Sequence, residues 1–230
     1  MTAPSSSPAA PGAAPRPLGR ALLVLKESTV DRVAHLQNQG SSRIRQLLED
    51  EDRSVADIRA SHEEHTRSVE VVRRVLEARG IEVEEQKGFP TRVVEGFDLV
   101  IAVGGDGMVL GVSHAVRHAI PVLGVNSAPS FSVGYLSGCT ADALLETLDA
   151  LESGALEPLD VQRLQLRVGD RVIAEPVLND LLFCADNPAM MSRYLLMWPD
   201  GQEVQRSSGV WISTPAGSTA ALASAVGPIL

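Results

Sequence analysis

Residues 99–110 read LVIAVGGDGMVL, and this stretch decides the fold of the chain. The five apolar residues 99–103 are typical of a buried parallel strand. The loop GGDG (104–107) follows directly, and the apolar residues after it have helical spacing. A strand, a glycine-rich turn and a helix in this order predict a place where backbone N–H groups can approach an anion.

The carboxylate of Asp106 is the unexpected member of this loop. A negative charge repels phosphate, so a simple phosphate-binding turn would not carry one. It fits chemistry in which a carboxylate holds Mg²⁺, or takes the proton from a hydroxyl group that attacks phosphorus. The alternative is a tight strand-to-helix turn in which Asp106 is the N-cap of the helix. The loop alone leaves both interpretations open.

Length, composition and charge set wider limits. A chain of 230 residues forms one large or two small domains and has ample length to bury a core. The formal net charge of −9 argues against nucleic-acid or anionic-membrane partners. Cys139 and Cys184 are far apart, which excludes a disulfide framework and favours a reducing compartment, for which we expect the cytoplasm. No apolar run is long enough to predict a membrane span.

Strand and helix patterns alternate in the first part of the chain. Residues 1–18, rich in Ala, Pro and Ser, are predicted to form a disordered tail. An α/β domain with a Rossmann-like parallel sheet is predicted over 19–155. Its expected strands are 21–27, 81–86, 99–103 and 120–126, and its expected helices are 28–37, 41–79, 108–118 and 140–153.

A second, β-rich domain is predicted over 156–230. Residues 164–174 suggest a hairpin around Gly169-Asp170, and further strands are expected at 177–184, 192–199 and 209–215. We expect this domain to be β-sandwich-like and incomplete at its C-terminal end.

Two polar segments interrupt the apolar strands of the second domain. Asn179 and Asp180 are adjacent inside the strand 177–184, so one of the two side chains faces the core and needs a partner or a ligand. In 213–228, which begins STPAGSTA, Ser218 or Thr219 is placed to cap an Ala-rich helix. Hydroxyl and N–H groups there suit a ribose, a phosphate or a purine edge. The alternatives are a satisfied structural pair and an ordinary capped turn.

The histidines offer no clear metal site. His62 and His65 lie on a charged helix, and His114 and His118 are four residues apart. Two histidines at this spacing can bind a metal, but neither pair has a third ligand or a catalytic Glu at the spacing of HExxH. Structural or surface roles are therefore predicted for all four, and we predict no side-chain metal site.

The motifs GGDG, LND (178–180) and STPAGSTA (213–220), in this order, resemble those of the NAD kinase family over about residues 20–230. The strings IPVLGVNSAP, LNDLLFCADNPAMMSRY and RSSGVWISTPAGSTAA look closest to the plant and mitochondrial NADH/NAD kinases. The resemblance implies transfer of phosphate from ATP, with Mg²⁺, to the 2′-hydroxyl of the adenosine ribose of NAD⁺ or NADH. It also implies a homodimer or homotetramer whose other partners are these small molecules.

The resemblance assigns roles to individual residues. Asp106 would accept the ribose 2′-hydroxyl proton. The glycines of the loop would lie against the phosphates of ATP and NAD, Asn126 would border the NAD site, and Asn179 and Asp180, where most of the family has Asn-Glu, would hold the adenosine or ribose. Ser208 stands where most members have Asp. The implied binding residues are Gly104, Gly105, Gly107, Asn126, Asn179, Asp180, Ser208, Thr219, Ala220 and Ser224.

Three features depart from the family pattern. Met108 occupies the position of the usual Thr after GGDG, Ala221 replaces the Tyr that usually follows STA, and relatives continue well past residue 230. A catalytically impaired fragment or a non-catalytic nucleotide-binding homologue is therefore the main alternative to an active NAD(H) kinase. A GGDG-type lipid or sugar kinase is a weaker one, because it does not predict LND and STPAGSTA. The choices between NAD⁺ and NADH, and between ATP and polyphosphate, stay open.

Overall fold

The computed structural model describes residues 17–37, 53–117, 119–187 and 189–229. Most of the expected tail, and the first part of the helix expected over 41–79, lie outside the described residues. The chain divides into two compact units, which we describe separately. Unit 1 contains residues 1–112 and 118–159, and unit 2 contains residues 113–117 and 160–230.

Unit 1 is built on a parallel sheet, as the sequence predicts, and the sheet has five strands, because the unpredicted two-residue strand β5 joins the four expected ones. The strand order is β2-β1-β3-β4-β5, and Leu23, Ile101 and Leu123 are aligned across three neighbouring strands. The wholly buried strand β3 lies in the middle, which explains its unbroken apolar sequence. The strands are β1 (Arg20–Leu25), β2 (Glu82–Lys87), β3 (Leu99–Gly104), β4 (Val122–Asn126) and β5 (Cys139–Thr140).

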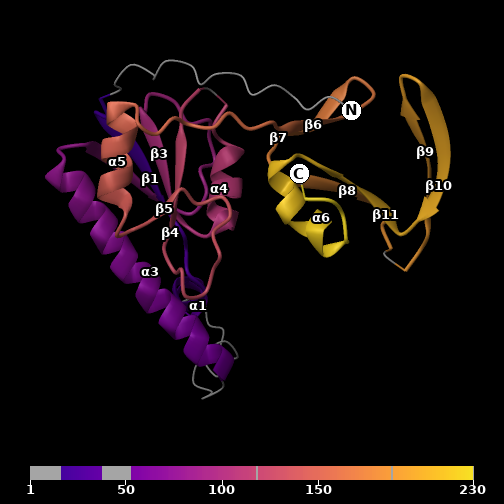
Figure 1. Ribbon diagram of the computed structural model, residues 1–230. Coiled ribbons are helices and arrows are strands. Elements are labelled where there is room, and N and C mark those ends of the chain that lie inside the picture. Colours follow the sequence, from indigo (N-terminus) through magenta and orange to yellow (C-terminus); the bar gives the residue numbers. More distant parts are fainter. Residues whose placement is uncertain (1–16, 38–52, 118, 188, 230) are drawn as a thin grey trace. The chain divides into compact units, whose positions relative to one another are not determined.

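Helices cover both faces of this sheet (Figure 1). Helices α3 (Arg53–Ala78) and α5 (Leu144–Ser153) lie on one face, and α4 (Asp106–Ser113) lies on the other; α1 is Thr29–Gln37. Alternate residues of each strand face α3 and α5, where they form the main core. Its fully buried members include Leu23, Ile101 and Val125 from the sheet, Val72 and Leu76 from α3, and Leu144 and Leu148 from α5.

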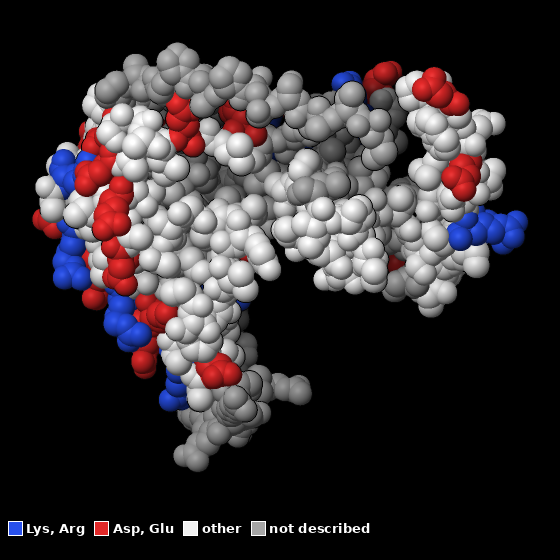
Figure 2. All heavy atoms as spheres, in the orientation of Figure 1, with Lys and Arg blue, Asp and Glu red and all other residues white. Residues whose placement is uncertain are grey.

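Charged side chains are gathered on the outer side of α3, where Figure 2 shows Lys, Arg, Asp and Glu following one another along the helix. Arg79, at the end of α3, forms ion pairs with Asp149 and Glu152 of α5. Helix α5 then ends at Gly154, whose left-handed conformation (φ 73°) lets its N–H donate to Leu151 O. These contacts fix α3 and α5 side by side on the sheet.

Helix α4 is shorter than predicted, because it ends at Ser113 instead of continuing to residue 118. Arg163, an unpredicted partner, donates through Nη1 to Ser113 O at 3.1 Å and to Val116 O at 2.6 Å. The guanidinium therefore satisfies carbonyl groups beyond the end of α4. A basic residue 50 positions further along the chain gives no signal in the local helical pattern.

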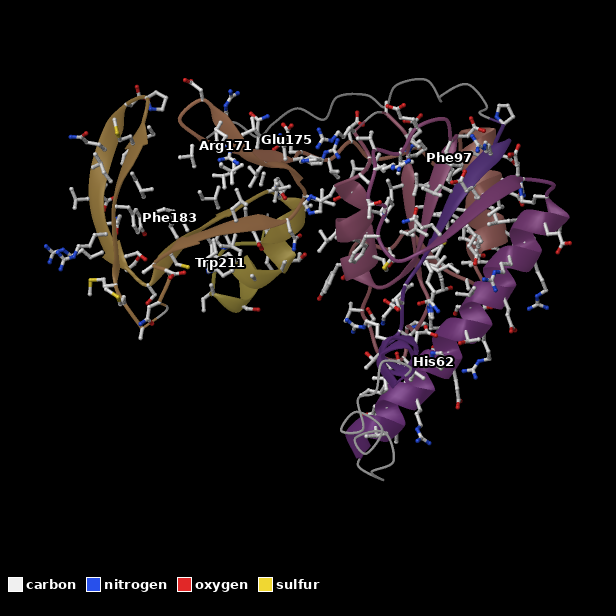
Figure 3. All side chains as sticks on the ribbon, turned by 180° about the vertical axis from the view of Figure 1, so that it is seen from behind. His62, Phe97, Arg171, Glu175, Phe183 and Trp211 are labelled. Carbon is white, nitrogen blue, oxygen red and sulfur yellow. The ribbon has the colours of Figure 1, made fainter. Side chains whose placement is uncertain are left out.

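Unit 2 contains three small antiparallel sheets, each of two strands: β6-β7, β11-β8 and β10-β9. Gly169 has a positive φ in the hairpin between β6 and β7, as expected there. Phe183 of β8 meets Tyr194 of β9 edge to face, with 5.7 Å between ring centroids (Figure 3). The strands are β6 (Leu164–Val168), β7 (Arg171–Val177), β8 (Asp180–Cys184), β9 (Ser192–Trp198), β10 (Gly201–Ser207) and β11 (Gly209–Ser213).

A 3₁₀ turn, η1 (Ala216–Thr219), and a single helical turn, α6 (Ala221–Ser224), follow the last strand. The Ala-rich helix expected in 213–228 is therefore much shorter than its composition suggests. The N–H of Gly227 donates back to Leu222 O, and Val226 has a φ of 64°, so the chain leaves the helical path after one turn. An α/β domain with a parallel sheet, followed by small antiparallel sheets, confirms the predicted fold class.

His65 is the buried polar link between α3 and the sheet. Its Nδ1 lies 2.8 Å from Ser127 Oγ, and its Nε2 lies 3.2 Å from the carbonyl oxygen of Lys26. Since a carbonyl only accepts, Nε2 carries the proton and the Ser127 hydroxyl donates to Nδ1. Burial, followed by the nearby charge of Lys26, lowers the pKa of His65 from its usual 6.5. The neutral ring thus joins the residues that follow β1 and β4.

We predict that acid destabilises the chain in part through His65. Because its folded-state pKa lies below the unfolded value, the unfolded chain binds the proton more readily, and stability falls as the pH drops from about 6.5 through the lowered pKa. His65→Gln should cost about 1–3 kcal/mol at pH 7.5 through lost hydrogen bonds, yet lose less stability between pH 7.5 and 5.5 than the parent chain.

The measurement is urea unfolding followed by far-ultraviolet circular dichroism at several pH values. Both tryptophans, Trp198 and Trp211, lie in unit 2, so their fluorescence gives an internal control for a unit that His65 does not belong to. An equal loss of stability on acidification in the variant and the parent chain would show that His65 does not carry the effect.

Candidate active site

The Asp106 carboxylate is held at the carboxyl end of β3 by two backbone N–H groups. Leu136 N donates to Oδ1 at 2.8 Å, and Tyr135 N donates to Oδ2 at 3.0 Å. Asp106 is the first residue of α4, but these bonds go to the segment that follows β4 and not to the helix itself. The side chain is therefore oriented across the sheet edge, in the region where open α/β sheets bind ligands.

Asn126, the last residue of β4, shapes the segment that holds Asp106. Its Nδ2 donates to Ser132 O at 2.9 Å, and its Oδ1 accepts from Ala128 N at 3.3 Å. Gly134 (φ 70°) lies so close that an added Cβ would be 2.7 Å from Asn126 Nδ2. In this structure the Asn126 amide thus organises residues 127–137, and it acts on Asp106 through that segment.

The three glycines of the GGDG loop differ in what surrounds them. None of them has a positive φ, so the requirement for glycine is close approach and not an unusual turn conformation. A Cβ on Gly104 would lie 2.3 Å from Met108 Cγ, and one on Gly105 would lie 3.1 Å from Ser132 Oγ. A Cβ on Gly107 would meet nothing within 4 Å. Gly107 therefore has open space beside it at the start of α4, and no contact with the described residues requires glycine there.

The carbonyl of Asn179 is the point at which the LND and STPAGSTA segments meet. It accepts hydrogen bonds from Thr214 N at 3.0 Å, Thr214 Oγ1 at 3.2 Å and Ser213 Oγ at 3.4 Å. Strands β8 and β11 align Asp180 with Ser213 beside these bonds. Two segments far apart in the sequence thus form one polar corner of unit 2.

Asp180 carries the clearest sign of a missing partner. Its Oδ2 is buried and has no hydrogen-bond partner among the described residues. A buried carboxylate oxygen is costly unless a donor reaches it. The side chain is therefore suited to accept a hydrogen bond from a ligand hydroxyl or amine.

The remaining predicted residues surround this corner less closely. Ser208 precedes β11, and its carbonyl accepts from Ser192 Oγ at 3.4 Å. Thr219 lies in η1 and donates to Ala216 O at 3.4 Å, while Ala220 and Ser224 belong to the turn of α6. The prediction that Ser218 or Thr219 caps this helix is wrong. The N-cap is Ala220, with no side-chain bond, because both hydroxyls already bond to carbonyls before the turn.

The predicted residues thus fall into two groups. Gly104, Gly105, Asp106, Gly107 and Asn126 meet at one edge of the parallel sheet in unit 1. Asn179 and Asp180 meet the STPAGSTA turn in unit 2, and each group is described within its own unit. Sequence reasoning missed Thr214, which is 2% exposed, although its hydroxyl organises the turn. Its only signal was a position between β11 and Pro215.

Two features were not found among the described residues. Among them, no three His, Cys, Asp or Glu side chains lie close enough together to bind a metal ion. No helix in the described ranges has the length and apolarity needed to cross a membrane.

The described fold is thus a parallel α/β sheet with an acidic glycine-rich loop, followed by small antiparallel sheets. Residues 23–156 match the family described as the ATP-NAD kinase N-terminal domain. Because this match covers more than half of the chain, the protein belongs to the NAD kinase family.

Individual relatives agree with this assignment. A probable NADH kinase from Oryza sativa is 32% identical over 188 residues, which cover 72% of this chain and 58% of the relative. An NAD kinase from Azotobacter vinelandii is 35% identical over 174 residues, covering 70% of this chain and 54% of the relative. This chain thus spans a little over half the length of these curated relatives.

Two solved structures share the fold. An Archaeoglobus fulgidus NAD kinase in complex with ATP has a TM-score of 0.57 at 21% identity, and the match covers 92% of this chain and 67% of that one. A yeast NADH kinase complexed with NADH has a TM-score of 0.54 at 20% identity, with 94% and 63% covered.

We predict that Gly217→Ala disrupts the polar corner of unit 2. The added Cβ would lie 2.1 Å from Asn179 O and 2.5 Å from the carbonyl carbon, and these backbone atoms have little freedom to move. The expected loss is about 1–3 kcal/mol or more. Urea unfolding followed by tryptophan fluorescence measures it, since Trp198 and Trp211 both lie in unit 2. Gly107→Ala, where the Cβ meets nothing, is the control and should leave this transition unchanged.

Proposed function

We propose that this protein is an NAD(H) kinase, which transfers the γ-phosphate of ATP to the 2′-hydroxyl of the adenosine ribose of NAD⁺ or NADH. Family membership supports the reaction class. The observation that carries the proposal is the Asp106 carboxylate, which is fixed by Tyr135 N and Leu136 N beside Gly107. A base in this position suits a reaction that needs an oriented hydroxyl and little covalent chemistry.

The proposed step transfers one phosphoryl group and one proton. The ribose O2′ forms a bond to the γ-phosphorus, the bond from that phosphorus to the β,γ-bridging oxygen breaks, and ADP leaves with the electron pair. Asp106 accepts the hydroxyl proton. The two N–H groups keep the carboxylate in one orientation, which favours proton transfer from one direction. The space at Gly107 admits phosphate oxygens close to the backbone.

A divalent cation fits this donor set when it arrives with the nucleotide. Mg²⁺ is usually bound by one or two carboxylates together with substrate phosphates, and it neutralises charge during phosphoryl transfer. Asp106 is the carboxylate at the loop that would face such an ion.

The polar corner of unit 2 is proposed to bind the dinucleotide. The unpartnered Asp180 Oδ2 suits a ribose hydroxyl or the adenine amino group. Asn179 and the turn that carries Thr219 and Ala220 lie beside it, and the backbone of Asn179 is fixed by Thr214. We extend the proposal to Ser208 and Ser224, whose hydroxyls would border the same ligand.

Met108 supports one second candidate, a protein that binds nucleotide without turnover. Its side chain is 5% exposed and packs against Gly104, so no hydroxyl is available where the family usually has Thr. Nucleotide binding without product formation would identify this candidate.

We further propose a homodimer or homotetramer in the cytoplasm. Large apolar side chains on the small sheets of unit 2 are exposed, among them Leu182, Phe183, Met197 and Val204, and a second copy would cover such a surface. Cys139 and Cys184 are free thiols, which suits a reducing compartment. Light scattering coupled to gel filtration measures the oligomeric state.

We predict that Asp106→Asn lowers the rate of NADP(H) formation by about 10²–10⁴-fold, because the amide cannot accept the hydroxyl proton. The assay contains ATP and Mg²⁺, with NAD⁺ and NADH in separate reactions, so it also measures the preferred redox form. Asp98→Asn is the matched control. The Asp98 carboxylate also accepts two backbone N–H groups, from Gly19 and Arg20, but at the opposite end of the sheet.

The control variant should retain the parent turnover. Full activity in Asp106→Asn would refute the role of Asp106 as proton acceptor. A parent chain that binds both substrates but forms no NADP(H) would refute the kinase proposal and favour the non-catalytic candidate.

We predict that Asp180→Ala weakens NAD⁺ binding about tenfold, through the loss of a hydrogen bond to a charged group, and leaves ATP binding unchanged. Because Oδ2 has no protein partner, removing it should not lower the stability of unit 2, as followed by tryptophan fluorescence. Asp186→Ala, at an exposed position of the same unit, is the control. Destabilisation with unchanged NAD⁺ affinity would identify Asp180 as a structural residue.

A further inference from the structure

A cavity lies at the carboxyl end of the sheet, where β1 ends. It has a volume of about 230 Å³, and its walls include Lys26, Ser28, Ser61, His62, His65 and Phe131. None of these residues is among those assigned to nucleotide binding above. Figure 3 shows the labelled His62 where α3 passes α1. Drug-sized ligands usually occupy pockets of about 300–1,000 Å³, so this cavity suits a smaller group.

Lys26 connects this cavity to the GGDG loop. Its N–H donates to Val103 O at 2.9 Å, and its carbonyl accepts from His65 Nε2 at 3.2 Å. A Cβ added to Gly104 would lie 3.2 Å from Lys26 Cβ, so the lysine stem begins directly beside the loop. Its backbone is thus held between the middle of the sheet and α3.

The ammonium group of Lys26 is not neutralised by any carboxylate of the described residues. Several other cations of unit 1 form ion pairs, for example Arg73 with Glu85 and Lys87 with Asp31. The second of these pairs removes Asp31 as a competitor, although it lies only five residues from Lys26. Asp57 also lines the cavity, but no ion pair joins it to Lys26. A lysine beside a glycine loop, without a carboxylate partner among the described residues, is suited to bind an anion.

The other polar groups of the cavity are already ordered. The Ser28 hydroxyl donates to Asp31 Oδ2 at 2.9 Å, so the contact of 2.8 Å with His62 requires His62 Nδ1–H to donate. With Nδ1–H donating to Ser28, Nε2 of the neutral His62 ring can only accept a hydrogen bond, so Lys26 is the donor that this cavity offers to an anion. His65, buried behind the cavity, uses both nitrogens within the protein. Hydrogen bonds thus fix both His62, through Ser28, and the backbone of Lys26, through Val103 and His65.

We propose that Lys26 and this cavity bind phosphate groups of a nucleotide engaged at the GGDG loop. The inference rests on the proposed function, which it extends by naming the cation that meets the phosphates. We choose phosphate as the ligand class because a phosphate group is anionic, is small enough for the cavity and is already expected at the adjoining GGDG loop. It belongs either to the triphosphate of ATP or to the pyrophosphate of the dinucleotide.

The test measures binding by calorimetry, without turnover, using the full chain. The ligands are inorganic tripolyphosphate, ATP and NAD⁺, each titrated at two salt concentrations. Lys26→Met removes the charge and keeps a long stem beside Gly104, and Lys26→Arg keeps the charge. Lys87→Met is the matched control, because this lysine is also in unit 1 but is paired with Asp31.

Lys26→Met should weaken tripolyphosphate and either ATP or NAD⁺ by about tenfold, as expected for loss of one charge-assisted contact, and should reduce the salt dependence. Lys26→Arg should retain most of the affinity, and Lys87→Met should change it less than twofold. Loss of ATP affinity assigns the cavity to the triphosphate, and loss of NAD⁺ affinity assigns it to the pyrophosphate.

Affinities within twofold of the parent chain for all three ligands in Lys26→Met would overturn the inference. Circular dichroism of each variant shows that the fold is retained, and Ser61→Asp gives an independent check by placing a negative charge in the same cavity. Because the readout is binding, a chain that forms no NADP(H) but binds phosphate through Lys26 refutes the kinase proposal alone. A chain that forms NADP(H) with unchanged affinities in Lys26→Met refutes this inference alone.

Discussion

The site in unit 1 depends on the pair of hydrogen bonds from Tyr135 N and Leu136 N to the Asp106 carboxylate. These bonds join the end of β3 to the segment that follows β4, and so they tie the glycine loop to the neighbouring strand. Two backbone donors hold a carboxylate without introducing a competing positive side chain. Asn126 supports these two hydrogen bonds indirectly, because its amide fixes the path of the segment that supplies both N–H groups.

Unit 2 contains a comparable set of hydrogen bonds, but the acceptor there is a backbone group instead of a side chain. Here a backbone carbonyl, that of Asn179, is the acceptor, and Ser213 and Thr214 supply the donors. Gly217 is required because any side chain there would strike this carbonyl. In unit 1 two backbone N–H groups satisfy a side-chain carboxylate, and in unit 2 one backbone N–H and two side-chain hydroxyls satisfy a backbone carbonyl. Asp180 Oδ2 has no protein partner among the described residues.

The sequence predicted most strands of both units, since apolar runs and glycine turns are local signals. It missed the two-residue β5 and the strand β10, whose sequence GQEVQRS has no apolar run. It placed Asp106 directly after a strand, as observed, but it placed Asn179 inside the strand 177–184, whereas Asn179 lies between β7 and β8. It did not predict the end of α4 at Ser113, because the responsible contact comes from Arg163, nor the short α6, where Ala-rich composition favours a longer helix. The sequence also did not show why position 104 requires glycine, because the requirement comes from Met108 and Lys26, which pack against Gly104. Contacts between distant segments leave no periodic pattern to read.

The edge of the parallel sheet that carries Asp106 must also bind negatively charged groups if the proposed function is correct. The chain carries a formal net charge of −9, and both proposed substrates are anions, so this edge needs local neutralisation. Much of the exposed charge instead follows α3 (Figure 2). At the edge itself, backbone N–H groups meet Asp106, Lys87 pairs with Asp31, and burial keeps His65 neutral. Lys26 has no carboxylate partner among the described residues, and its position beside Gly104 gives an acidic protein a positive charge where phosphate is expected.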